Sequence, residues 1–163
     1  MIKLDEKNCL ILNLLQKNCR MSLTEISKNV NLSVDSVRKR LKKLTEQGIF
    51  APKIQLRPKT FGFKNIIDVK IKIKNHDEKK LQEFIDCLIK NPRVAEIFAV
   101  SGEWDFTLVI LAKDAADLGH VTKSIRNKFN KIISNWAESL TTQAYKFEDY
   151  DMLKLLHPNV KVK

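Results

Sequence analysis

Hydrophobic positions within the first fifty residues repeat at the spacing of α-helices. Residues 4–18 carry an apolar stripe, with acidic residues in the first turn, where the helix dipole favours them. A second helix is expected after Ser22, because Ser22 and Glu25 form an S-x-x-E capping box. A third is expected between Ser33, which can cap it, and Gly48, which can end it. The apolar face of this third helix consists of Val34, Val37, Leu41 and Leu44.

The third predicted helix is strongly basic on the face opposite its apolar stripe. Residues 38–43 contain five Lys/Arg and no acid, whereas a solvated surface helix usually mixes charges to gain i,i+4 pairs. A basic helix that follows a short capped helix across a turn has the order of a helix-turn-helix. We therefore expect double-stranded DNA as a partner. The residues expected to bind DNA are Ser22, Ser33, Asp35, Ser36, Arg38, Lys39, Arg40, Lys42 and Lys43.

The second half of the chain alternates strand and helix patterns. Residues 66–74 alternate apolar and charged side chains with a period of two, which predicts a strand with one buried face. A helix is expected over 77–90, strands over 94–101 and 105–112, a helix opened by Asp114, and a last strand over about 136–147. The order βαββαβ is that of a ferredoxin-like fold.

These patterns predict an α+β protein with four parts. We expect a helix-turn-helix domain at residues 1–50 and a linker at 51–62 that holds a hinge and a wing. The wing is expected as two short strands, at 49–50 and 53–56. A ferredoxin-like domain should follow at 63–150, and then a basic, loosely packed tail at 151–163.

Charge and cysteine content support this division. Residues 1–62 hold 13 Lys/Arg against 5 Asp/Glu, while the rest of the chain holds 17 against 14. Basic charge concentrated in one domain indicates a polyanionic partner. The three cysteines lack C-x-x-C spacing and the three histidines are scattered, so no disulfide framework or metal site is expected. A reduced cytoplasmic, nucleoid-associated location without membrane contact is the expectation.

Motifs along nearly the whole chain resemble those of Lrp/AsnC (leucine-responsive, feast/famine) transcriptional regulators. The first domain matches at Leu4-Asp5, Ile11-Leu12, Leu15, Arg20, Ser22, Glu25-Ile26, Leu32-Ser33, Val37, Arg40, Leu44 and Gly48. The hinge matches at Leu56-x-Pro58-x-x-x-Gly62. The second domain, called RAM (regulator of amino-acid metabolism), matches at Pro92-x-Val94 and Gly102-x-x-Asp105.

The resemblance implies assembly and an effector. Members of this family are homodimers or larger assemblies such as tetramers and octamers, whose paired RAM sheets hold the DNA-binding units at a fixed separation. Many bind an amino acid or a related small molecule between RAM subunits. The corresponding effector-binding residues here are Ser101, Gly102, Glu103, Trp104, Asp105 and Thr142. A plain hairpin turn at residues 102–105 is the alternative for this loop.

Some residues depart from the family pattern. Residues 50–52 replace the usual glycine–aromatic pair of the wing. Lys70 and Lys72 occupy the strand face that packs against a partner subunit in the family, and buried unpaired lysines would be costly. Either Glu96 and Glu138 pair with these lysines, or the sheets pack more loosely than usual.

Two other functions compete with a regulator. Siroheme decarboxylases share the two-domain architecture, but their tetrapyrrole carboxylates call for clustered Arg and His. The second domain has only Arg93 and Arg126, on different elements and without a neighbouring histidine. We therefore expect no enzymatic activity and no cofactor. A nucleoid-type DNA-coating protein stays open as an alternative, since phosphate contacts carry affinity without sequence information.

Overall fold

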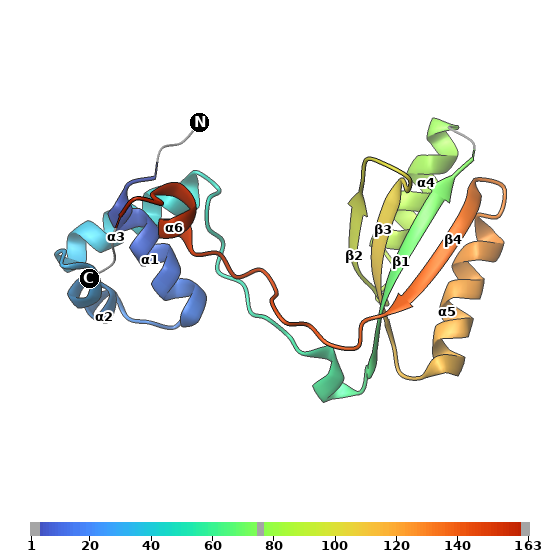
Figure 1. The fold of residues 1–163 in the computed structure, drawn as a ribbon, viewed down its shortest axis with the longest axis horizontal. Helices are drawn as coiled ribbons and strands as arrows, with labels where there is room; N and C mark the ends of the chain where they lie inside the picture. The colour runs from blue at the N-terminus through green and yellow to red at the C-terminus, as the bar shows by residue number, and fades with distance from the viewer. Residues whose placement is uncertain (1–3, 75–76, 161–163) are drawn as a thin grey trace. The chain divides into compact units, whose positions relative to one another are not determined.

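The chain divides into two compact units, and each is described by itself. The computed structural model describes residues 4–74 and 77–160. One unit combines the chain up to Gln55 with the segment from Tyr145 onward, and the other spans Leu56–Ala144. Figure 1 shows the helical unit and the sheet-containing unit.

The helical unit begins with three helices in the predicted places: α1 (Glu6–Lys17), α2 (Leu23–Val30) and α3 (Val34–Glu46). Ser22 accepts the backbone N–H of Glu25, and the Glu25 carboxylate reaches back to Ser22, which completes the capping box. Ser33 caps α3 by accepting from Ser36. Between α2 and α3, Asn31 adopts the left-handed conformation with φ 52°, which Asn tolerates better than most residues.

The C-terminal segment differs from the expectation of a loosely packed tail. Residues Met152–Leu156 form a short helix, α6, which packs against α1. Leu153 is 3% exposed and belongs to the same apolar cluster as Leu12 of α1 and Leu44 of α3. The sequence alone did not predict this helix, because five residues are too few for a stable helix in water. It forms where α1 offers an apolar surface.

The predicted strands of the wing are absent: residues 49–57 form no strand. Ile54 and Leu56 are 80% and 65% exposed, so the apolar side chains of the second expected strand are not buried. A two-stranded hairpin is marginal on its own, and Pro52 lacks the N–H that a ladder requires. The two short strands expected at 49–50 and 53–56 therefore do not form in this chain.

The second unit has the expected ferredoxin-like order. Its elements are β1 (Asn65–Ile73), α4 (Glu78–Ile89), β2 (Val94–Ala99), β3 (Phe106–Ala112), α5 (Ala115–Lys128) and β4 (Ile133–Leu140), after a 3-10 turn at Pro58–Phe61. The strands pair antiparallel in the order β2-β3-β1-β4. The last strand ends at Leu140 rather than near residue 147.

One face of this sheet carries the core, and the other lies open. The inward residues of β1 and β3 pack with Phe84 and Leu88 of α4 and Ile125 of α5. In β1 the inward side chains alternate with Asp68, Lys70 and Lys72, as period two requires. The outward side of β1 carries Lys70 and Lys72, as the sequence predicts.

Lys72 pairs with Asp105 rather than with Glu138. The Lys72 ammonium lies 3.1 Å from the Asp105 carboxylate. Glu138 faces the helix side, opposite Val69, and accepts a hydrogen bond from the Trp136 indole at 2.6 Å. The pairing with Glu138 was therefore wrong, because the β1–β4 register places that residue on the other face.

Candidate nucleic-acid interface and effector loop

The exposed face of α3 carries the cations that the sequence predicts. Val37 and Leu44 anchor the helix at 0% and 2% exposure. On the opposite side, Arg38, Lys39, Lys42 and Lys43 are all exposed. This side of α3 is therefore positive and accessible, as binding to DNA requires.

Two acidic residues lie among these cations. Asp35 and Arg38 form an exposed i,i+3 ion pair, and Lys42 lies 3.8 Å from Glu46. Exposed pairs of this kind contribute little, so either cation can exchange its partner for a phosphate at small cost. Lys39 and Lys43 have no ion pair within the described part of the chain.

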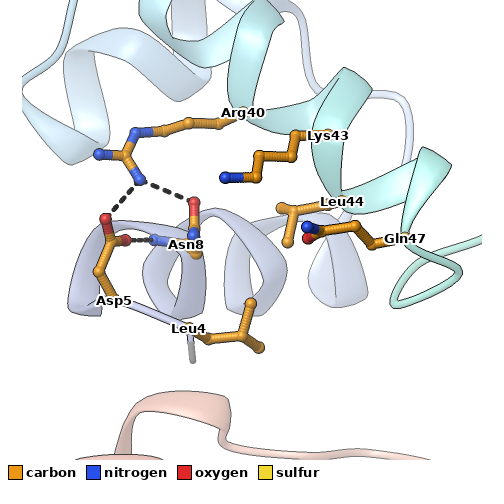
Figure 2. A pocket seen from close by; sticks show the side chains of 7 residues that line it. All are labelled: Leu4, Asp5, Asn8, Arg40, Lys43, Leu44 and Gln47. Atoms are coloured by element: carbon orange, nitrogen blue, oxygen red, sulfur yellow. Dashed lines mark hydrogen bonds and ion pairs between the residues drawn. The ribbon is translucent and has the colours of Figure 1, made fainter. Parts of the chain in front are cut away.

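Arg40 is the predicted DNA contact that the structure places differently. Its guanidinium donates to Asp5 at 2.6 Å and to Asn8 at 2.8 Å, and its side chain is only 31% exposed. Figure 2 shows these bonds beside a surface cavity of about 520 Å³. The cavity is lined by Leu4, Asp5, Asn8, Arg40, Lys43, Leu44 and Gln47. Arg40 thus joins α3 to the start of α1.

The contact with Arg40 changes the pKa of the Asp5 carboxylate. Partial burial alone would raise its pKa, but the hydrogen bonds from Arg40 and from the Asn8 N–H outweigh burial and lower it below the usual value. Asp5 therefore stays ionised and keeps Arg40 in place at neutral pH.

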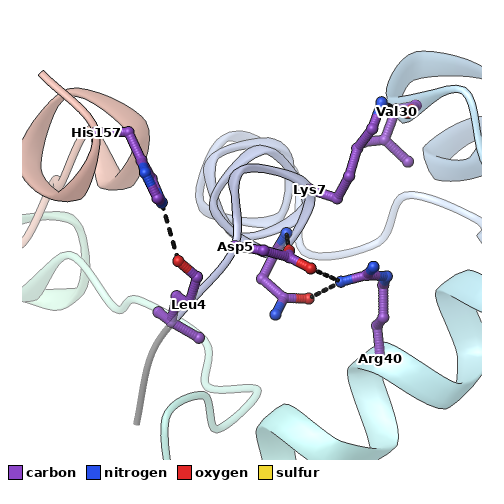
Figure 3. Close-up of polar contacts among 7 residues, drawn as sticks. Leu4, Asp5, Lys7, Val30, Arg40 and His157 are labelled. Carbon is purple, nitrogen blue, oxygen red and sulfur yellow. Dashed lines mark hydrogen bonds and ion pairs between the residues drawn. The ribbon is translucent and has the colours of Figure 1, made fainter. Parts of the chain in front are cut away.

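Lys7 is a positioning residue that the sequence did not single out. Its ammonium donates to the carbonyl oxygen of Val30 at 2.5 Å, which ties α1 to the last residue of α2 (Figure 3). A cation at a helix C-terminus is favourable because the last carbonyls carry partial negative charge. Nothing in the periodicity of α1 distinguishes Lys7 from an ordinary surface lysine.

The candidate effector loop is held to β1 through Asp105. Gly102 has φ 127°, a conformation that favours glycine. The Asp105 N–H donates to the Ile71 carbonyl at 3.0 Å, and its carboxylate accepts the Ile73 N–H at 2.7 Å in addition to the Lys72 ammonium. Ser101, Gly102 and Glu103 are exposed, and Trp104 is half-buried.

Thr142, the remaining predicted effector residue, does not join the loop within one chain. The neighbouring Thr141 N–H donates to the Ile66 carbonyl at the start of β1, whereas Asp105 bonds to Ile71 and Ile73 at its end. Ile73 lies seven positions after Ile66 along the strand, or about 23 Å at 3.3 Å per residue. One chain therefore presents two separate parts of the predicted site.

Metal and membrane features can be stated for residues 4–74 and 77–160. This part of the chain contains no cluster of three or more His, Cys, Asp or Glu side chains that could hold a metal ion. It also contains no helix that is both long and apolar enough to span a bilayer.

Comparison with known proteins places both units. Residues 4–50 match the model of a winged helix-turn-helix DNA-binding domain, and residues 68–135 match that of the Lrp/AsnC ligand-binding domain. The HTH-type transcriptional regulator LrpA of Pyrococcus horikoshii is 34% identical over 130 residues, which cover 79% of this chain and 88% of LrpA. The chain belongs to the Lrp/AsnC family of transcriptional regulators.

Two further transcriptional regulators are similar to this chain. The regulator Ptr1 of Methanocaldococcus jannaschii is 32% identical over 71% of this chain and 77% of its own. A transcriptional regulator of Neisseria meningitidis, solved as a complex with L-Met, superposes with a TM-score of 0.81. It is 25% identical, with 89% of this chain and 94% of that chain covered. Both the fold class and the function of a DNA-binding regulator with a ligand-binding domain are confirmed.

Proposed function

We propose that this Lrp/AsnC regulator reads duplex DNA through the exposed face of α3. The observation that carries the proposal is the orientation of that helix, with Val37 and Leu44 buried and Arg38, Lys39, Lys42 and Lys43 exposed. Ser33, Asp35, Ser36, Lys39 and Lys43 approach base edges, and Arg38 and Lys42 approach phosphates. Ser22, at the start of α2, contacts the sugar-phosphate backbone of the DNA. Arg40 acts indirectly, by holding α1 against α3.

Footprinting on the DNA upstream of the chain's own gene tests this function. Discrete protected sites are expected for a sequence-specific regulator. Uniform coverage at all concentrations would instead support the nucleoid-type protein, because phosphate contacts carry no sequence information. Repeating the footprint with a panel of amino acids tests the effector in the same experiment.

Substitutions of Lys42 and Asp35 should affect different aspects of DNA binding, the overall affinity and the sequence preference. Lys42→Ala should weaken binding to all duplexes alike and reduce the slope of log K against log salt by about 0.9, the value for one lost phosphate contact. Asp35→Ala should change sequence preference more than affinity, since a carboxylate accepts from cytosine N4 but is repelled by phosphate. Fluorescence anisotropy on several duplexes at three salt concentrations measures both effects.

Lys17 supplies the matched control for Lys42. It is an exposed lysine in the last turn of α1, outside α3. Lys17→Ala should leave the salt slope of the wild-type chain unchanged. An unaltered slope for Lys42→Ala would show that the docking face is wrong.

The proposed active form is a homodimer or a larger assembly joined through the open sheet face. This face carries Phe98 at 53% exposure next to Lys70 and Thr107. Two-fold pairing sets recognition helices one DNA turn apart, about 34 Å. It also offers a way to complete the effector site, since a second copy can bring its Thr142 to the loop at residues 101–105.

An exposed phenylalanine on that face allows the assembly to be tested. Phe98→Asp should raise the monomer fraction at micromolar concentration, because it buries a charge in the proposed contact. Ile89→Asp is the matched control, since Ile89 is 64% exposed at the end of α4, outside the open face. Light scattering measures the molar mass of the wild type, of Phe98→Asp and of Ile89→Asp. A monomeric wild type would contradict the proposal.

The effector that fits this loop is a small zwitterion. Glycine at position 102 leaves the loop amides accessible to a carboxylate, and the half-buried Trp104 can lie against the effector's side chain. The complex of the Neisseria regulator with L-Met supports this class of ligand. An ammonium group would share Asp105 with Lys72, so effector binding should loosen the contact between these two residues.

A further inference from the structure

The C-terminal segment docks onto α1 at a defined site. Leu153 enters the apolar cluster formed with Leu4, Cys9, Leu12 and Leu44, and Met152 and Val160 pack at its edge. Leu155, two residues further along the same short helix, is 65% exposed. One side of α6 is therefore fitted to α1, and the other faces water.

Two side-chain amides of α1 fix the register of this docking. Asn13 donates to the Asp151 carboxylate at 3.0 Å and accepts the Met152 N–H at 2.8 Å. Gln16, one turn later, donates to the carbonyl of Tyr150 at 2.8 Å and accepts its N–H at 2.9 Å. Four hydrogen bonds from two residues spaced i,i+3 select one position of the incoming segment.

The docked segment and the recognition helix hold the same end of α1. His157 bonds through Nε2 to the Leu4 carbonyl at 2.9 Å, while Arg40 of α3 bonds to Asp5 and Asn8 (Figure 3). In the interior, Leu153 of α6 and Leu44 of α3 belong to one apolar cluster. Attachment of the segment therefore influences how α1 supports α3.

The same contacts are suited to reversible attachment. A helix of five residues has no stability of its own, so α6 folds only when it docks. The bonds of Gln16 are exposed to water, which competes for them. Elements with few buried contacts open at low free-energy cost. The segment also follows β4 along the chain, after residues 141–149, which include Thr142.

We propose that the C-terminal segment 150–160 is a detachable element that sets the DNA affinity of its own chain. Docked on α1, it holds the start of α1 against α3 in the geometry that binds DNA. Undocked, it leaves that end of α1 unsupported and DNA binding weakens. This inference rests on the proposed role of α3, and it gives the ligand-binding domain a second covalent route to the DNA-binding unit.

Cys9 is a built-in reporter of docking. It is 0% exposed and belongs to the same apolar cluster as Leu153, and burial raises the pKa of its thiol. Only the thiolate reacts, so alkylation of Cys9 requires this cluster to open to water. Under the proposal, release of Leu153 opens it. Cys19, which is exposed, and Cys87, which is half-buried, are internal references in the same chain.

The test compares three full-length variants by iodoacetamide labelling with mass spectrometry. Leu153→Ala should speed alkylation of Cys9 about tenfold or more, because it removes most of the buried side chain of the segment. The double variant Asn13→Ala, Gln16→Ala should do the same without harming α1, since alanine is the best helix former. Leu155→Ala is the matched control and should label at the wild-type rate. Equal Cys9 rates in all proteins would overturn the docking.

The DNA affinity of the docking variants distinguishes a regulatory role of the segment from a purely structural one. The two docking variants should bind the chain's own upstream duplex about tenfold more weakly, in parallel with their Cys9 rates. By linkage, that duplex should slow Cys9 alkylation of the wild type while leaving Cys87 of α4 unaffected. Faster alkylation with unchanged DNA affinity would refute the proposal and leave the role of α3 intact. A wild type that bound neither this duplex nor heparin would refute the proposed function itself.

Discussion

Phe84→Ala is expected to destabilise the sheet-containing unit by about 3–5 kcal/mol, the usual cost of emptying a buried phenylalanine site. Phe84 is 0% exposed and packs edge-on against two other rings, with centroid separations of 5.9 Å to Phe106 and 5.1 Å to Phe129. It joins α4, β3 and the end of α5. The loss is a large fraction of the total stability of a typical domain.

The chain provides a matched control for this variant. Ile89 lies in the same unit, at the end of α4, but is 64% exposed and outside the open sheet face, so Ile89→Ala should cost far less. Calorimetry should show the melting temperature of the sheet unit lowered by about ten degrees or more for Phe84→Ala. The transition of the helical unit should move much less, because its apolar clusters are separate. Equal effects of the two variants would contradict the packing described here.

Periodicity in the sequence accounts for most of what could be predicted. Val37 and Leu44 were identified as the buried side of α3, and the alternation in β1 placed Lys70 and Lys72 on the open face. These positions follow from local geometry alone, because a helix repeats every 3.6 residues and a strand every two. The family motifs added the ligand-binding role, which no spacing within the chain could reveal.

What the sequence missed depends on surfaces that exist only after folding. Arg40 lies on the flank of α3, three residues after Val37, and only the position of α1 decides whether it turns to Asp5 or to solvent. The docking of Leu153 requires a cluster assembled from α1 and α3. The contact of Asp105 with the Ile73 N–H depends on the course of the chain around the turn before β3, which composition does not determine.

The Asp105 contacts separate a structural from an effector-binding role for the loop at residues 101–105. The carboxylate already accepts from Lys72 and from the Ile73 N–H, so the unliganded chain uses it. Asp105→Ala should lower the stability of the sheet unit by about 1–3 kcal/mol, because the Ile73 N–H loses its partner. Asp105→Asn should be far milder, since the amide oxygen can still accept that N–H and the Lys72 pair is partly exposed.

Thermal shift with amino acids then tests the effector role on the milder variant. A ligand at 100 times its dissociation constant stabilises the wild type by about 2.7 kcal/mol. Asp105→Asn should lose that shift, because a neutral amide cannot balance the charge of an ammonium group. Deaminated analogues should fail on the wild type as well, because they lack the ammonium group that Asp105 would bind. If Asp105→Asn retained the full shift, the ammonium would bind elsewhere, and the carboxylate would serve only to hold the loop to β1.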